Sequence, residues 1–230
     1  MTDAPAYHRH IRIEPEPGVV SAWLEDDYHH MGVTLRHDGA RVVDAQAEIV
    51  RAPWSTCPGA MAKLAETFTG ASLAEAVVYS EKKQNCTHLH DMAGLAAAHA
   101  ADDAPTLYRV AATDPVGGER VLGVSRDGST IHRWVEQDNR LVQPPELAGK
   151  SLFEIGDWLS GLDPAEQEAA RILRWGAIVA HGRQIPIENQ SDASRIPPNC
   201  YTFQPGRKEL ARRIGEIVDF ATAKREPLSG

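Results

Sequence analysis

Two short segments gather side chains that can take up, release or hold protons. One is "EDDYHHMG", residues 25–32, where three acids precede a tyrosine and two histidines. The other is "NCTHLHD", residues 85–91, with a cysteine, two histidines and an aspartate. Histidine titrates near neutral pH and also ligates metals, so these residue types indicate either acid–base chemistry or a metal site.

The first segment contains a candidate base together with an acid that can orient it. Successive residues of a regular strand face opposite sides, so His29 and His30 should not enter one pocket. One of the two can act as a general base, with an acid such as Asp26 holding its ring. The alternative is a polar loop between two strands.

The second segment is predicted to open a helix. Thr87 is the expected N-cap residue, because a hydroxyl can accept a hydrogen bond from the first helical turn. On such a helix His88 lies on one face, while His90 points elsewhere and is expected at the surface. The buried stripe has three- and four-residue spacing and consists of Leu89, Met92, Ala93 and Ala96.

A zinc site is the alternative interpretation of the same segment. Cys86 lies just before the helix, near its positive end, where a thiolate is favoured. C-x-H-x-H is not an established zinc spacing, so a site would need ligands from distant segments. The zinc hypothesis uses Cys57, Cys86, His88 and His29, whereas the other interpretation of the cysteines is buried structural thiols.

A third group could contact a bound molecule. In "CYTFQPGR", residues 200–207, Tyr201 could line a site, although such a segment can also dock the helix that follows it. Arg51 could hold a phenolate or a carboxylate electrostatically.

Patterning predicts the elements that must position these residues. Strands grouped with strands and helices grouped with helices indicate an α+β fold, with antiparallel sheet packed against several helices. The chain is expected to be one domain over 1–230, or two lobes with a boundary near 102–105. Predicted strands are 19–26, 31–39, 40–53, 107–112, 120–125, 130–135 and 140–142. Predicted helices are 58–67, 73–83, 87–101, a short one from 151, 163–183 and 207–221.

Composition excludes several classes of protein. The formal charge of -8 and pI of about 5.7 argue against a nucleic-acid groove. No apolar run reaches the ~20 residues of a membrane span, and the first residues lack the apolar core of a secretion signal. Three cysteines are a poor disulfide framework, which favours the cytoplasm. No nucleotide-binding or serine-hydrolase motif is present, and a homodimer is the base-rate expectation.

Three elements together resemble a bacterial family catalogued as a domain of unknown function. The elements are His29-His30-Met31, Cys57-Pro58 opening a helix, and Cys86-Thr87-His88-Leu89 before a helix of small residues. The family typically has His-Asp-Met as the first element, so His30 stands here where an aspartate is usual. The C-terminal segment also resembles the longer members, so the resemblance covers most of the chain.

One branch of that family includes a phenylcoumaran γ-formaldehyde lyase of aromatic catabolism. The resemblance implies a cofactor-independent carbon–carbon lyase that releases formaldehyde from a phenolic, lignin-derived aromatic and leaves a stilbene. The alternatives are a zinc-binding protein and a non-catalytic module that binds a small ligand. The expected catalytic residues are His29, His88, Asp26 and Arg51, and the expected substrate contacts are Tyr28, His30 and Tyr201.

Overall fold

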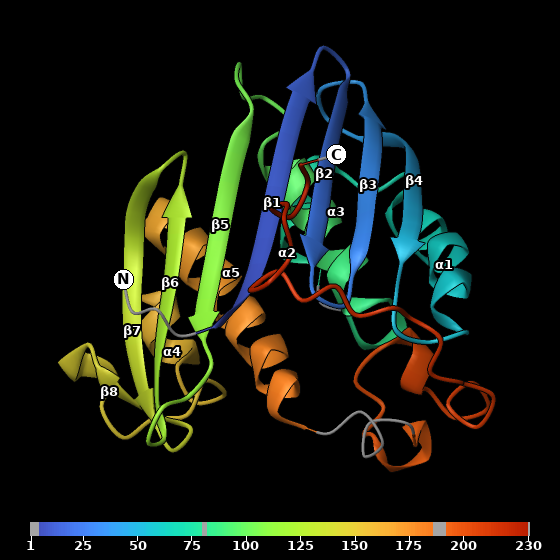
Figure 1. Cartoon of the computed structure of the whole chain (residues 1–230). Coiled ribbons are helices and arrows are strands. Elements are labelled where there is room, and N and C mark those ends of the chain that lie inside the picture. Colours follow the sequence, from blue (N-terminus) through green and yellow to red (C-terminus); the bar gives the residue numbers. More distant parts are fainter. Residues whose placement is uncertain (1–4, 80–81, 186–191, 230) are drawn as a thin grey trace. The chain divides into compact units, whose positions relative to one another are not determined.

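The computed structural model describes residues 5–79, 82–185 and 192–229 (Figure 1). The strands follow the order β4-β3-β2-β1-β5-β6-β7-β8 in the sheet. The chain divides into two compact units: a larger unit of residues 11–106 and 187–217, and a smaller unit of 1–10, 107–186 and 218–230. β1 (Ala6–Glu16) contributes residues to both. The division between residues 106 and 107 falls next to the predicted boundary.

Antiparallel strands with one buried face form the sheet of the larger unit. Along β2 and β3 every second residue is apolar and buried, for example Leu24 and Leu35, as the period of a strand requires. Trp23 lies opposite Gly32 in the register, and a Cβ at that glycine would overlap the indole ring. The strands beside β1 are β2 (Val19–Asp26), β3 (His30–His37) and β4 (Val42–Arg51).

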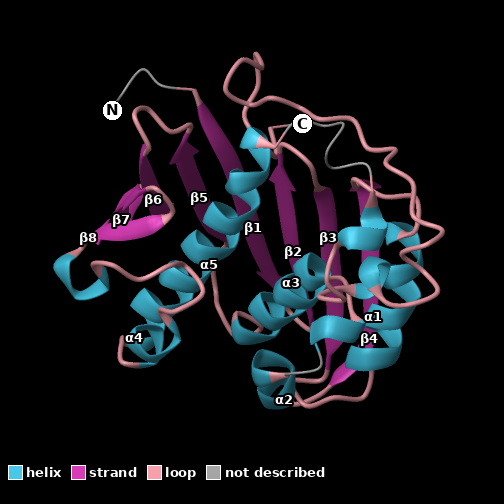
Figure 2. Ribbon diagram, turned by 90° about the horizontal axis from the view of Figure 1, so that it is seen from below, coloured by secondary structure: helices cyan, strands magenta, loops and turns pink. Residues whose placement is uncertain are grey.

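Helices of the larger unit cover one face of this sheet (Figure 2). α3 packs on β2 and β3, and α1 packs on β4. The predicted stripe of α3 is confirmed, because all four of its residues are buried, and its small side chains allow a close approach to the sheet. After the short 3-10 turn η1 (Cys57–Gly59), the helices are α1 (Ala60–Phe68), α2 (Leu73–Val78) and α3 (Thr87–Ala98).

The smaller unit repeats the pattern of antiparallel strands with helices. Asp163 caps α5, because its carboxylate accepts hydrogen bonds from the backbone N–H groups of Ala165 and Glu166. α5 packs against β6 and β7, so the α+β prediction is confirmed. The elements are β5 (Thr106–Thr113), β6 (Glu119–Arg126), β7 (Ser129–Gln137), β8 (Arg140–Gln143), α4 (Gly156–Ser160) and α5 (Pro164–Ala180). No helix in the described ranges combines the length and apolarity that a membrane crossing requires.

The helix predicted over 207–221 is wrong. This segment runs without regular helix beside residues 52–55, and Trp54 and Arg213 form an isolated β-bridge. The backbone N–H of Ser55 donates to Arg212 (2.9 Å), and that of Ile214 donates to Pro53 (3.1 Å). These tertiary hydrogen bonds outweigh the modest helix propensity of the segment.

Gly215 provides a test of this docking. A Cβ at this position would lie 2.5 Å from the carbonyl oxygen of Ala52 and 2.8 Å from the Cα of Pro53. Because backbone atoms cannot easily move aside, Gly215→Ala should lower the free energy of unfolding by about 1–3 kcal/mol in urea denaturation. Gly156→Ala is the control, since no atom lies within 4 Å of its Cβ position. Equal stability of the two variants would contradict the docked arrangement.

Candidate active site

Asp26 organises the turn that joins β2 to β3. Its Oδ1 accepts hydrogen bonds from the backbone N–H groups of Tyr28 and His29, each at 2.8 Å. Its own N–H donates to the carbonyl of His29 at 2.8 Å. An aspartate that accepts from the backbone two residues on replaces a backbone turn contact. The carboxylate is thus fixed by the chain itself and is fully buried.

This carboxylate also holds the imidazole of His29. Nδ1 lies 3.0 Å from Oδ1 and 3.3 Å from Oδ2 of Asp26. A carboxylate can only accept, so the contact favours the tautomer with the proton on Nδ1. Nε2 then carries the lone pair. The contact is the one that a general base makes with an acid that orients its ring.

His88 stacks on this imidazole. The two ring centroids are 4.0 Å apart and the ring planes are inclined by 34°. His88 lies in the first turn of α3, whose N-cap residue is Cys86 rather than the predicted Thr87. The two chemistry-bearing segments therefore meet in space, although 59 positions separate His29 from His88. Donor atoms of Asp26, His29 and His88 all lie within 4.8 Å of one another.

The two imidazole rings face each other rather than a common point between them. A metal bound by an imidazole lies close to the ring plane, about 2 Å from the nitrogen. The planes of the His29 and His88 rings are inclined by only 34°. Their line of intersection therefore lies much farther than about 2 Å from the ring nitrogens. One ring would have to turn before both could bind one ion. Among the described residues, the close donor group contains neither Cys57 nor Cys86, so the predicted zinc set is not gathered.

Arg51 holds the turn from the end of β4. Its Nη1 donates to the carbonyl of Asp27 (2.7 Å), and its Nη2 donates to the carbonyl of Asp26 (2.8 Å). Nη2 also lies 3.1 Å from Oε1 of Glu25. These contacts engage the guanidinium within the turn, which makes Arg51 a positioning residue rather than a direct contact for a phenolate.

The turn concentrates negative charge in the interior. Glu25, Asp26 and Asp27 are at most 1% exposed, and Arg51 donates hydrogen bonds to this turn. Fixed carboxylates in a low-dielectric site stabilise positive charge that develops on nearby groups. The site can therefore stabilise an imidazolium formed during proton transfer. Sequence inspection noted the three acids but not their burial.

His30 and Tyr28 flank the histidine pair. His30 contacts different partners from His29: its Nδ1 is 3.8 Å from Glu25 Oε1, and its ring lies edge-on to Trp23. The two neighbouring histidines thus have separate surroundings, because His29 lies in the turn and His30 begins β3. Tyr28 is buried, and its ring centroid lies 6.3 Å from that of His29.

The prediction that His90 is at the surface is wrong. It is 6% exposed and packs against Phe68 (5.2 Å between ring centroids) and Tyr79 (5.9 Å). The physical reason is that α1 and α2 also contact α3, so this helix is covered on more than its sheet-facing side. Burial, and then the charge of Lys82, lower the pKa of His90 to about 4. The ring is neutral at pH 7 and belongs to the core.

The three cysteines occupy segments that pack together. Cys57 Sγ lies 3.4 Å from Thr202 Oγ1, and the N–H of Tyr201 donates to the carbonyl of Asn85 at 2.9 Å. This hydrogen bond places Cys200 beside Cys86. Burial raises the pKa of all three thiols, in the case of Cys86 to about 12.

Thiol labelling checks this arrangement. The thiolate is the reactive form, so iodoacetamide at pH 7.5 should label the native protein far more slowly than the chain unfolded in guanidinium chloride. Mass spectrometry after timed quenching measures the rate at each cysteine. A native labelling rate at Cys86 equal to that of the unfolded chain would contradict the raised pKa of its thiol.

Part of the larger unit matches a known protein family. Residues 13–102 match the family described as Protein of unknown function (DUF2889). The predicted resemblance to a family of unknown function is confirmed over this range, whereas the branch is not identified. The DUF2889 match lies in the larger unit and includes Asp26, His29, Arg51 and His88. Tyr201 lies outside it. No curated protein matches the chain.

Proposed function

We propose that the larger unit is a cofactor-independent carbon–carbon lyase. Its substrate would be a phenolic, lignin-derived phenylcoumaran, and its products formaldehyde and a stilbene. The observation that carries the proposal is the stacked His29–His88 pair, with Asp26 holding one of the rings. The resemblance described above supplies the substrate class, and the geometry supplies the proton-transfer groups that this reaction requires.

The reaction conserves electrons and needs only proton transfers. Electrons from the substrate's phenolate open the furan ring, which gives a quinone methide, and the released phenoxide takes up a proton. A base then removes the proton of the γ-hydroxyl group. The bond between Cβ and Cγ breaks, formaldehyde leaves, and the electron pair forms the Cα–Cβ double bond as the quinone methide returns to a phenolate. Stilbene and formaldehyde together contain all the atoms of the substrate.

The histidine pair can serve both proton transfers. His29 would accept the γ-hydroxyl proton at Nε2, because Asp26 engages Nδ1 and stabilises the resulting imidazolium. His88, whose ring centroid is 4.0 Å away, would donate to the phenoxide. A positioned acid or base typically contributes 10²–10⁴-fold to a rate.

The test is incubation of the purified chain with a phenylcoumaran. Formaldehyde is measured by its acetylacetone adduct and the stilbene by its near-ultraviolet absorbance, and equal amounts of both are expected. The control substrate has its free phenol methylated, and it should not react because no phenolate can form. Chromatographically unchanged phenolic substrate, with no formaldehyde, would reject the proposal.

A divalent-metal site is the second candidate. Donor atoms of Asp26, His29 and His88 within 4.8 Å of one another favour it, although His88 would have to turn. Here the ligands would be this carboxylate and these two imidazoles, not the cysteines. Elemental analysis of the purified protein decides between the candidates: one equivalent of zinc or another divalent metal supports the second, and a substoichiometric content removes it.

A further inference from the structure

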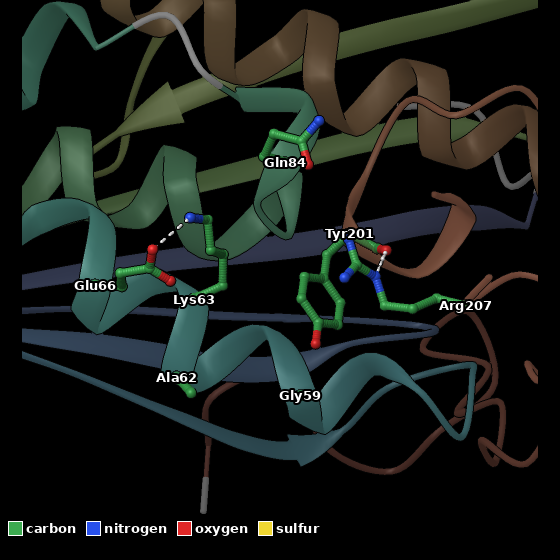
Figure 3. A pocket seen from close by; sticks show the side chains of 7 residues that line it. All are labelled: Gly59, Ala62, Lys63, Glu66, Gln84, Tyr201 and Arg207. Carbon is green, nitrogen blue, oxygen red and sulfur yellow. Dashed lines mark hydrogen bonds and ion pairs between the residues drawn. The ribbon is translucent and has the colours of Figure 1, made fainter. Parts of the chain in front are cut away.

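A cavity lies in the larger unit, beside the start of α1 (Figure 3). Its volume is about 400 Å³, a size suited to a small molecule. None of Asp26, His29 and His88 lines it. The proposed lyase chemistry therefore leaves this cavity unexplained. Residues that line it include Gly59, Lys63, Glu66, Gln84, Tyr201 and Arg207.

Arg207 is held rigidly at this cavity. Its Nε donates to the carbonyl of Tyr201 at 2.8 Å, and its Cζ lies 3.9 Å from the centroid of the Tyr201 ring. These two contacts fix the plane of the guanidinium, as Figure 3 shows. A guanidinium that is already ordered loses less conformational freedom when it binds a ligand.

Several polar groups at the cavity lack partners within the described part of the chain. They are the two terminal nitrogens of Arg207, the side-chain amide of Gln84 and the hydroxyl of Tyr201. The Tyr201 hydroxyl reaches the backbone at Gly59, where a Cβ would lie only 2.7 Å from its oxygen. Glycine at this position thus leaves room for the phenol.

The charge of the cavity favours an anion. Two cationic side chains, Lys63 and Arg207, line the cavity together with one carboxylate, that of Glu66. The Oε1 atom of Glu66 lies 3.1 Å from Lys63 Nζ. The Glu66 side chain is 71% exposed, so water screens much of that pair. Arg207 remains the uncompensated cation. Its planar pair of N–H groups matches the two oxygens of a carboxylate.

We propose that this cavity binds the carboxylate of a small organic acid. Arg207 binds both carboxylate oxygens, and Gln84 and the Tyr201 hydroxyl supply further hydrogen bonds. The inference is independent of the lyase proposal, because it shares no residue with the histidine pair.

Calorimetric titration with benzoate tests the inference, with benzamide as its neutral isostere and inorganic phosphate as a different anion. Benzoate should bind the full chain at least tenfold more tightly than either comparison compound. Arg207→Gln should weaken benzoate binding at least tenfold. Arg212→Gln is the matched control, because Arg212 lies on the same segment and bonds to the nearby carbonyls of Glu209 and Ala211; it should bind as the wild type does.

The variant Gly59→Ala tests whether benzoate binding depends on the shape of the cavity as well as on the charge of Arg207. Its φ is -63°, so alanine fits the backbone, but the new Cβ would displace the Tyr201 hydroxyl. Benzoate binding should weaken although Arg207 is intact. Equal binding of benzoate and benzamide, undiminished binding by Arg207→Gln, tighter binding of phosphate, or no benzoate binding by the wild type would each overturn the proposal.

Discussion

Replacement of His29 by glutamine is expected to lower the rate of formaldehyde release by about 10²–10⁴-fold. Glutamine can keep a hydrogen bond to Asp26, but it cannot accept a proton near neutral pH. The decrease in rate should appear mainly in kcat and not in KM. The reason is that the proton is transferred in the transition state, whereas substrate binding involves no proton transfer. Steady-state assays of formaldehyde and stilbene measure kcat and KM separately.

The matched control for this variant is His37→Gln. His37 lies at the end of β3 and accepts a hydrogen bond from the backbone N–H of Gly39, away from the stacked pair. It should retain the wild-type rate, and far-ultraviolet circular dichroism should show that both variants are folded. A folded His29→Gln protein with at least one third of the wild-type kcat would remove His29 as the base.

Replacement of Arg51 by alanine should give the largest loss of stability. Its guanidinium bonds to the carboxylate of Glu25 and to the carbonyls of Asp26 and Asp27, and the Glu25 side chain is 1% exposed. Removal of one partner of a buried ion pair typically costs about 3–5 kcal/mol. Urea denaturation followed by tryptophan fluorescence measures this loss.

A double variant distinguishes lost charge pairing from lost packing. Arg51→Ala combined with Glu25→Gln removes both charges, so part of the stability should return. Arg212→Ala is the surface control and should change the free energy of unfolding by less than about 0.5 kcal/mol. If Arg51→Ala were as stable as the Arg212 variant, the buried pair would not hold the turn.

Sequence patterns could predict the local parts of this site. Helical spacing separates His88 from His90, whereas His29 differs from His30 because it lies in the turn before β3. Helical spacing gives faces but not partners. The stacking of His29 on His88 depends on the placement of α3 against β2 and β3, which no local period contains.

Other misses have the same physical origin. The burial of His90 comes from the contacts of α3 with α1 and α2. The helical pattern of the sequence does not show that these two helices cover this face of α3. The segment over 207–221 has enough helix formers to predict a helix, yet its backbone bonds to residues 52–55. Pairing of Glu25 with Arg51 could have been inferred from register, since His30 lies opposite both residues. However, the register of β3 and β4 shifts between His30 and Met31, and the sequence does not reveal this shift.

Arg51 is the last residue of β4, and β4 is the terminal strand in the order of the sheet. The ends of edge strands open more readily than the centre of a sheet, at a free energy below that of global unfolding. Opening at this end would release the guanidinium from the turn while the remaining strands stayed paired. Hydrogen exchange should therefore detect opening near residue 51 at urea concentrations below the global transition. Any activity that depends on the turn should decline at the same urea concentrations, below those that unfold the whole protein.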